Sequence, residues 1–274
     1  MLPKDPARLA ANLSALALKK QVTVYELWPD PPVELPDGVT VGVRSQKERR
    51  RFVRPVDPNV LDWFESFESG DVFYDIGANC GSLTLAAAGK HRENLTIVAI
   101  EPGFANFESL TRNLSRNGML GAVIPLQLAL LDRTGLEPIN YYRSTAAGTS
   151  LHAVGRPVDH EDKEFTPVET QMVLAYALDD LIETLGLPEP THVKIDVDGM
   201  EGALLKGATR TLARGNIKDL LVEIVDHDRS GTRLSAIREL MAGVGYELAE
   251  THDHHPGDPG SFVADYVFRR GASR

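Results

Sequence analysis

Short apolar runs alternate with amphipathic segments along most of the chain, from about position 71 onward. Runs of the kind that favours buried strands occur at residues 72–76, 96–100, 123–130, 192–197 and 220–225. Between them, apolar residues recur at helical spacing, as in Phe107, Leu110 and Leu114, Leu178 to Leu185, Leu204 to Leu212, and Leu234 to Met241. Two last runs, 246–249 and 262–268, complete seven strands. The alternation predicts an α/β fold with a mostly parallel sheet covered by helices on both faces.

Two segments depart from this alternation. Residues 1–57 combine an amphipathic run at 9–18 with short strand-like runs at 22–25 and 39–41, and we interpret them as an N-terminal extension. Residues 58–274 then form the main domain. Within it, residues 136–173 are long and mixed in character, which is typical of a lid or a binding loop inserted into a compact domain.

The charge balance of the chain limits the classes of molecule that we expect it to bind. Lys and Arg number 29 and Asp and Glu 39, so the formal net charge is −10. An acidic chain lacks the electrostatic footprint of a nucleic-acid binder and is repelled by anionic lipid, so we expect neither as a partner. One cysteine, Cys80, excludes an internal disulfide and a multi-cysteine metal site. Lys19-Lys20 stands where a signal peptide would have small residues, which favours an N-terminal helix and a cytoplasmic protein.

A glycine-rich turn follows the first strand of the main domain. Its pattern, Asp75-x-Gly77-x-x-x-Gly81, differs from the G-x-G-x-x-G of dinucleotide folds and from the phosphate-binding P-loop. The glycines allow a ligand to approach the backbone closely. Asp75, at the strand end, would attract a cationic amine and repel a phosphate. The alternative is an ordinary corner between a strand and a helix.

An acidic residue follows the second strand, at a fixed spacing from the glycine-rich turn. Glu101 lies 20 residues after Gly81 (101 − 81), and an acid at this spacing can accept hydrogen bonds from both hydroxyls of a ribose. The alternative is a solvated charge at a strand end. In parallel α/β sheets ligands bind at the carboxyl ends of the strands, where both features fall.

The fourth strand leads into Asp196 and Asp198, two carboxylates that share a side if the strand continues that far. Asp196 lies over the same crevice as Asp75. Glu201 falls in the first turn of the next helix, where an acid suits the helix dipole, so a structural role and a functional one are both open.

These elements together resemble the FkbM family of S-adenosylmethionine-dependent methyltransferases. The resemblance covers roughly residues 58–225. It is carried by FYDIGANCG (73–81), AIEP (99–102), Asn106 with Asn113, ALLDRTG (129–135), KIDVDGME (194–201) and LLVEI (220–224), of which KIDVDGME is the most specific.

The resemblance implies a Rossmann-like methyltransferase fold with a reversed C-terminal strand. It implies that the glycine-rich turn lines the methionine part of the cofactor, that Glu101 binds the ribose, and that the segment from Ala129 lies near the adenine. The expected cofactor-binding residues are Asp75, Gly77, Ala78, Asn79, Gly81, Ser82, Glu101, Pro102, Ala129 and Asp196. It further implies methylation of hydroxyl oxygens on sugars and polyketide-type natural products.

The acceptor hydroxyl would benefit from a base or a divalent cation, because an alcohol is a poor nucleophile at neutral pH. Asp196, Asp198 and His227 are the catalytic candidates near the acceptor, and His227 has the alternative of a solvated loop histidine. Asp196, Glu223 and His227 are the candidate ligands of a magnesium site.

Three other features carry further hypotheses. The basic run Lys47 to Arg51 with Arg54 suits a phosphate or a sugar nucleotide, or is a solvated surface or subunit contact. His252 to His255 suits a metal, but a solvated hairpin loop is favoured. Cys80 is explained by its small size in the turn rather than as a nucleophile.

The sequence therefore predicts an S-adenosylmethionine-dependent O-methyltransferase for a small hydroxylated acceptor. The extension 1–57 would shape the acceptor pocket or form a homodimer contact. An N-methyltransferase, another adenosyl-nucleoside-dependent transferase, and a non-catalytic S-adenosylmethionine-binding subunit are the alternatives.

Overall fold

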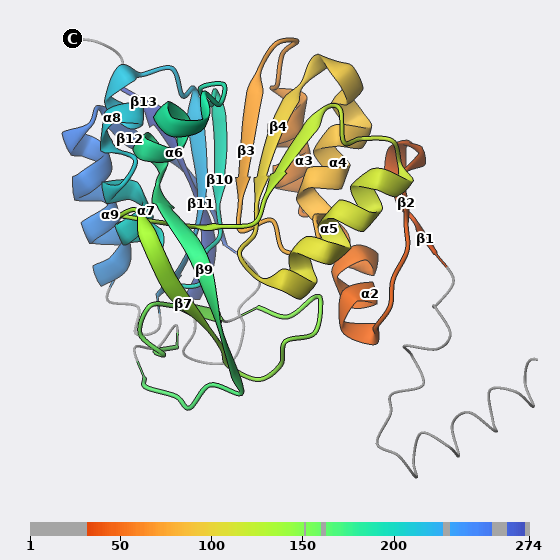
Figure 1. Ribbon diagram of the computed structural model, residues 1–274. Helices are drawn as coiled ribbons and strands as arrows, with labels where there is room; N and C mark the ends of the chain where they lie inside the picture. The colour runs from red at the N-terminus through yellow and green to blue at the C-terminus, as the bar shows by residue number, and fades with distance from the viewer. Residues whose placement is uncertain (1–31, 151, 160–162, 227–230, 254–261, 272–274) are drawn as a thin grey trace, which may run out of the picture.

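A seven-stranded sheet forms the centre of the molecule, in the order β12-β13-β11-β10-β3-β4-β5 (Figure 1). The structure, a computed structural model, describes residues 32–150, 152–159, 163–226, 231–253 and 262–271. The strands of the sheet are β3 (Val72–Ile76), β4 (Thr96–Ile100), β5 (Val123–Leu126), β10 (His192–Ile195), β11 (Asp219–Asp226), β12 (Tyr246–Asp253) and β13 (Phe262–Arg270). β13 runs antiparallel to both of its neighbours, and the other neighbouring pairs are parallel. The predicted α/β fold with a reversed C-terminal strand is confirmed.

Helices cover both faces of this sheet (Figure 1). Successive strand residues point to opposite faces, so Phe73 and Ile97 join one hydrophobic cluster while Tyr74 and Val98 join the other. On the first face lie α2 (Gln46–Val53), α3 (Pro58–Glu65), α4 (Ser82–His91) and α5 (Phe104–Arg116). On the second lie α6 (Leu178–Leu185), α7 (Glu201–Lys206), α8 (Thr209–Arg214) and α9 (Thr232–Gly243). In the parts of the chain that the structure describes, no helix is long and apolar enough to cross a bilayer.

A second sheet, in the order β6-β9-β7-β8, corrects the expected strand 123–130 and places strands within the expected insertion. The predicted strand 123–130 is divided: β5 ends at Leu126, and β6 (Ala129–Leu131) pairs instead with β9 (Glu169–Ala177). The segment 136–173 contains strands as well as loops, since β9 also pairs with β7 (Gly135–Tyr141), which pairs with β8 (His152–Val154). In Figure 1, β7 and β9 cross in front of the lower part of the central sheet.

The predicted helix over Leu204 to Leu212 is two helices, α7 and α8. The side chain of Asp179, from α6, accepts hydrogen bonds from the backbone N–H groups of Arg210 (2.8 Å) and Thr211 (2.7 Å). A carboxylate in this position accepts hydrogen bonds from the free N–H groups at the start of a helix. It therefore allows a second helix, α8, to begin here.

The described part of the N-terminal extension packs onto the main domain. A hairpin of β1 (Val33–Glu34) and β2 (Thr40–Val41) confirms the strand expected near residue 40, whereas the expected helix at 9–18 and strand at 22–25 lie outside the described residues. Asn113 of α5 and Asn117, the residue after that helix, hold β2 and the residue that follows it, because their Oδ1 atoms accept hydrogen bonds from the backbone N–H groups of Gly42 and Thr40 respectively. The fully buried Glu48 of α2 contacts Arg112 and Ser109 of α5.

A buried histidine joins the amino ends of β3, β10 and β11. His192 is 1% exposed, with Nε2 at 3.0 Å from Asp71 Oδ2 and Nδ1 at 2.8 Å from Asp219 Oδ1. Asp219 also accepts a hydrogen bond from Trp63 Nε1. Burial raises the pKa of Asp71, but hydrogen bonds from the Glu68 N–H, Lys218 and His192 outweigh it and hold the pKa well below the usual value. The stabilisation from Asp71 is therefore present above the unfolded pKa, near 4, and is lost as the pH falls below it.

We predict that His192→Ala lowers the free energy of unfolding by about 3–5 kcal/mol, because it leaves two buried carboxylates without their shared partner. Urea denaturation at pH 7 measures this loss. Arg156→Ala is the matched control, since the side chains of its ion pair with Glu164 are 79% and 77% exposed and the pair is worth at most about 1 kcal/mol. Equal losses of unfolding free energy in the two variants would show that the buried cluster contributes no more stability than an exposed ion pair.

Candidate functional site

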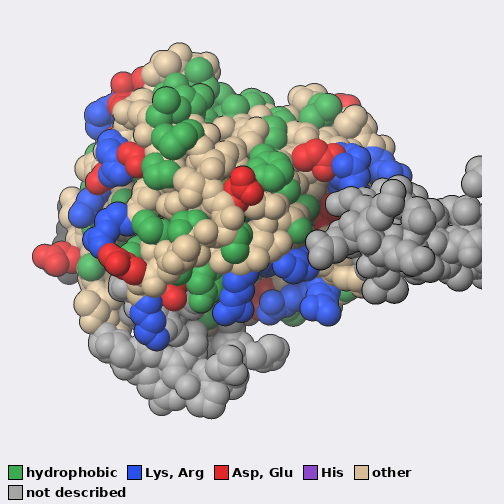
Figure 2. Space-filling model, turned by 60° about the horizontal axis from the view of Figure 1, so that its bottom comes forward, with side chains coloured by type: hydrophobic (Ala, Val, Ile, Leu, Met, Phe, Trp, Pro, Cys, Tyr) green, Lys and Arg blue, Asp and Glu red, His purple; other side chains and the backbone are tan. Residues whose placement is uncertain are grey.

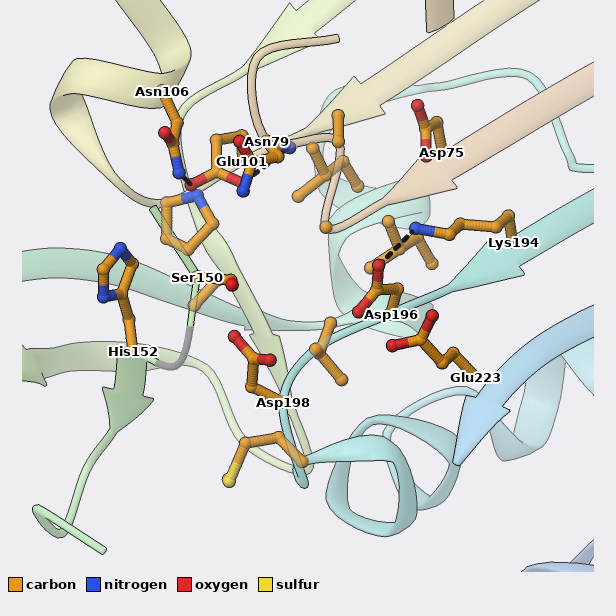
Figure 3. A pocket seen from close by; sticks show the side chains of 18 of the residues that line it. Asp75, Asn79, Glu101, Asn106, Ser150, His152, Lys194, Asp196, Asp198 and Glu223 are labelled. Carbon is orange, nitrogen blue, oxygen red and sulfur yellow. Dashed lines mark hydrogen bonds and ion pairs between the residues drawn. The ribbon is translucent and has the colours of Figure 1, made fainter. Parts of the chain in front are cut away.

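A cavity of about 390 Å³ opens at the carboxyl ends of β3, β4, β10 and β11 (Figure 3). The turn after β3 and the segments after β4 and β10 supply one part of its wall, and Ile139, Thr149, Ser150, His152 and Val154 supply another. The cavity also reaches α2 through Arg51 and Arg54. Its position at the carboxyl edge of a parallel sheet is where α/β folds bind ligands.

Asp75 stands at the end of β3, fully buried at the cavity wall. Its Oδ2 accepts a hydrogen bond from Thr84 Oγ1, while its Oδ1 has no hydrogen-bond partner. Burial raises the pKa of this carboxyl, although Lys194 counteracts the rise. An unpaired buried oxygen is costly, so this atom is suited to accept a hydrogen bond from a ligand.

Gly77 brings the turn against β10. Its φ is +82°, and a Cβ built on it would lie 1.8 Å from the Asp196 carbonyl oxygen, so only glycine fits. Ala78, Asn79 and Ser82 line the cavity beside it. Gly81 is not among the lining residues, and a Cβ built on it would lie 2.4 Å from Leu110 Cδ1 of α5.

Glu101 lies beyond the end of β4, 5% exposed. Its Oε2 accepts from the Asn79 N–H (2.9 Å), and its Oε1 from the Gly103 N–H (2.9 Å) and Asn106 Nδ2 (3.3 Å). Burial raises its pKa to about 7 despite these donors. A carboxylate has about four acceptor positions, so one remains for a ligand hydroxyl, and more if a donor gives way. Pro102 and Ala129 line the cavity near it.

Acidic side chains project into the cavity around one buried lysine (Figure 3). Lys194, 6% exposed, donates from Nζ to Asp196 Oδ2 at 3.0 Å. Burial lowers the pKa of Lys194, but Asp196, Asp75 and Glu223 outweigh it and hold the pKa above its usual value. Asp198 follows, with a positive φ of 51°. Strain of this kind in a cavity wall is typical of functional sites.

The contacts of Glu201 are those of a structural residue. It is 4% exposed, does not line the cavity, and accepts a hydrogen bond from the Gly199 N–H at 2.8 Å. This bond ties the turn before α7 to the first residue of the helix, where an acid also suits the helix dipole. Cys80 is buried in the turn, and burial raises the pKa of its thiol to about 12, which leaves it protonated at neutral pH.

The remaining candidates are only partly placed. His227 lies outside the described residues, as do His254 and His255, while His252 lies 3.1 Å from Glu250. Among the described residues there is no group of three His, Cys, Asp or Glu side chains arranged to hold a metal ion. Asp196 and Glu223 line the cavity, and a magnesium site that includes His227 stays a prediction.

Sequence reasoning missed the residues that the second sheet supplies. His152 of β8 lines the cavity, its ring 4.7 Å from that of Tyr141, and burial lowers its pKa to about 4, so it is neutral at physiological pH. Ser150 lines the cavity nearby. No local signal marks them, because the pairing of β7 with β8 and β9 brings them there.

A family model for the FkbM methyltransferase domain matches residues 75–248. The chain belongs to the FkbM methyltransferase family. The match begins at Asp75 and includes the glycine-rich turn, Glu101, the second sheet and the acidic cluster, so the cavity is largely built from the family domain. The α2 residues of the cavity wall lie before the matched range.

Relatives of this FkbM-family chain include two named methyltransferases. The chain is 32% identical over 161 residues to the hexuronic acid methyltransferase AglP of Haloferax volcanii, covering 58% of each chain. It is 26% identical over 265 residues to the 31-O-demethyl-FK506 methyltransferase FkbM of Streptomyces tacrolimicus, covering 88% of this chain and 97% of the relative. A crystal structure of methyltransferase FkbM from Methylobacillus flagellatus KT matches with a TM-score of 0.51 and 16% identity, over 79% of this chain and 49% of that one, which shows a shared fold.

We predict that Gly77→Ala lowers the free energy of unfolding by several times as much as Gly118→Ala. Both glycines have positive φ, +82° and +67°, so both variants carry a backbone penalty of about 1–2 kcal/mol. Only at Gly77 does the new Cβ also collide with backbone, whereas Gly118 has no heavy atom within 4 Å of the Cβ position. Chemical denaturation of the two variants measures the difference. Equal losses would contradict the close approach of the turn to β10.

Proposed function

We propose that the protein is an S-adenosylmethionine-dependent O-methyltransferase that methylates a hydroxyl of a sugar or polyketide-type small molecule. The observation that carries the proposal is one cavity shared by the glycine-rich turn at Asp75 and Gly77 and by the buried carboxylate of Glu101. Family membership supports methyl transfer. AglP and FkbM, named for a hexuronic acid and a demethylated FK506 as their substrates, support an oxygen acceptor.

The residues present fit the cofactor. Asp75 Oδ1, buried and without a partner, suits the ammonium group of the methionine part. Gly77 leaves room for a ligand against the backbone. Glu101 suits the ribose hydroxyls, and the adenine would find apolar surface at Pro102, Leu128, Ala129, Leu130 and Ile139. An adenosyl nucleoside with a positively charged tail therefore matches the charges along the cavity.

When bound, S-adenosylmethionine supplies a methyl group on a positively charged sulfur, and the bond from this carbon to sulfur breaks as the bond to the acceptor oxygen forms. The protein's task is to hold the acceptor in line and to take up the hydroxyl proton. Asp198 is our choice for the proton acceptor, with His227 as the second candidate. Asp196 is already paired with Lys194 and would position the reacting groups.

We predict that S-adenosylhomocysteine binds the wild-type protein and that its affinity rises about tenfold between pH 6 and pH 8. The pKa of Glu101 is raised to about 7, so the carboxylate that accepts ribose hydroxyls becomes ionised over this range. Calorimetric titration at several pH values measures it. Glu101→Gln should bind more weakly and with a flat pH profile, while the exposed Glu93→Gln, as control, should behave as wild type. If the wild-type protein binds no S-adenosylhomocysteine at any of the pH values tested, the proposed cofactor is refuted.

We predict that Asp198→Asn slows methyl transfer by about 10²-fold or more, the usual contribution of a general base, and leaves the affinity for S-adenosylhomocysteine unchanged. The assay follows product mass with a panel of hexoses, hexuronic acids and macrolide alcohols. Asp132→Asn, an exposed carboxylate outside the cavity, is the control. Unchanged turnover in Asp198→Asn would remove Asp198 from the mechanism and leave His227 as the candidate.

A further inference from the structure

A basic helix forms one side of the cavity of this acidic protein. α2 and the residue after it carry Lys47, Arg49, Arg50, Arg51 and Arg54. Their only acidic neighbour on the helix, Glu48, is fully buried against α5 and pairs there with Arg112. In Figure 2, which brings the bottom of the molecule forward, Lys and Arg side chains gather on the visible face. The basic run is thus a concentrated positive surface on a chain of net charge −10.

Two of these arginines, Arg51 and Arg54, line the cavity itself. Arg51 is half-buried and is held in place, since its Nε donates to the Gly148 carbonyl oxygen (3.1 Å) and its Nη2 to Ser150 Oγ (2.8 Å). Both acceptors are uncharged. Arg54 is exposed, and among the described residues neither arginine forms an ion pair with a carboxylate. The positive charges at this wall therefore remain available to a ligand.

The position of Arg54 favours the acceptor over the cofactor. The residues suited to the cofactor, Asp75 and Glu101, are at most 5% exposed, whereas Arg54 is open to solvent. An exposed cation at the cavity rim meets the molecule that enters over the bound cofactor. The acidic wall formed by Asp196, Asp198 and Glu223 would by itself repel an anion, so a guanidinium pair in the same cavity is needed if an acidic acceptor is to bind.

We propose that Arg51 and Arg54 bind an oxyanion of the acceptor, which is a sugar that carries a carboxylate or a phosphate group. This inference rests on the proposed function and adds the acceptor's charge to it. Guanidinium groups form paired hydrogen bonds with both kinds of oxyanion, and a positive rim also attracts anions before contact. The acceptor is then held with its anionic group at α2 and its reacting hydroxyl toward Asp198.

Calorimetric titration of the protein saturated with S-adenosylhomocysteine tests the proposal. The probes are D-glucuronate, with its neutral amide as partner, and glucose 6-phosphate, with glucose as partner. We expect wild type to bind at least one anionic probe tenfold or more tightly than its neutral partner, and whichever probe is preferred identifies the oxyanion.

The variants are Arg51→Gln, Arg54→Gln and the control Arg50→Gln. Arg50 is exposed on the same helix and outside the cavity, so its variant removes the same charge without removing a lining residue. We expect Arg54→Gln to lose most of the anion preference with its affinity for S-adenosylhomocysteine within twofold of wild type, and Arg50→Gln to keep the preference. Arg54→Gln is the decisive variant, because Arg51→Gln also removes the bonds to Gly148 and Ser150.

Four results would overturn the inference. The first is that neither anionic sugar binds, and the second is that charged and neutral sugars bind equally. The third is that Arg50→Gln loses as much of the anion preference as Arg54→Gln does. The fourth is that Arg54→Gln loses tenfold in affinity for S-adenosylhomocysteine and keeps the sugar preference. The last would assign the arginines to the cofactor carboxylate. A failure of wild type to bind S-adenosylhomocysteine is a separate result, which refutes the proposed function.

Discussion

A buried lysine among carboxylates organises the centre of the cavity. Lys194 on β10 stands in register with Asp75 on β3, and Lys194 Nζ also pairs with Asp196 two residues further along its own strand direction. One positive charge beside the buried Asp75 and the partly exposed Asp196 offsets the repulsion between the two carboxylates. The glycine at position 77 allows the two strands to deliver these groups so close together.

The parallel sheet, and the edge where the cavity opens, were predictable because strand and helix periodicity is a local property of the sequence. Asp75, Glu101 and Asp196 could be placed at one edge for the same reason. The divided strand after Leu126 was not predictable, since Ala129 finds its partner at Ala175, far along the chain. The strands of the insertion were equally hidden, because the pairing of Tyr141 with Glu169 and with His152 leaves no local signature.

The same limit applies to the site. The basic run can be recognised by its residue types, yet only tertiary structure brings Arg51 within 3.1 Å of Gly148, 97 residues away in the sequence. His152 and Ser150 were missed because nothing near them in the sequence suggests a ligand. Sequence alone allows a structural role and a functional role for Glu201. In the structure it accepts a hydrogen bond from the Gly199 N–H, a contact that fits the structural role.

Gly148 is the point where the second-sheet wall of the cavity meets α2. A Cβ at this glycine would lie 2.7 Å from the Glu48 backbone nitrogen, and φ is +83°, so the two segments touch backbone to backbone. The width of the cavity is thus set jointly by two pieces of chain that are about a hundred residues apart in sequence. A chimaera that imports only one of them from a relative would inherit mismatched walls. We expect that a graft of this cavity wall keeps its shape only when α2 and the segment around Gly148 move together.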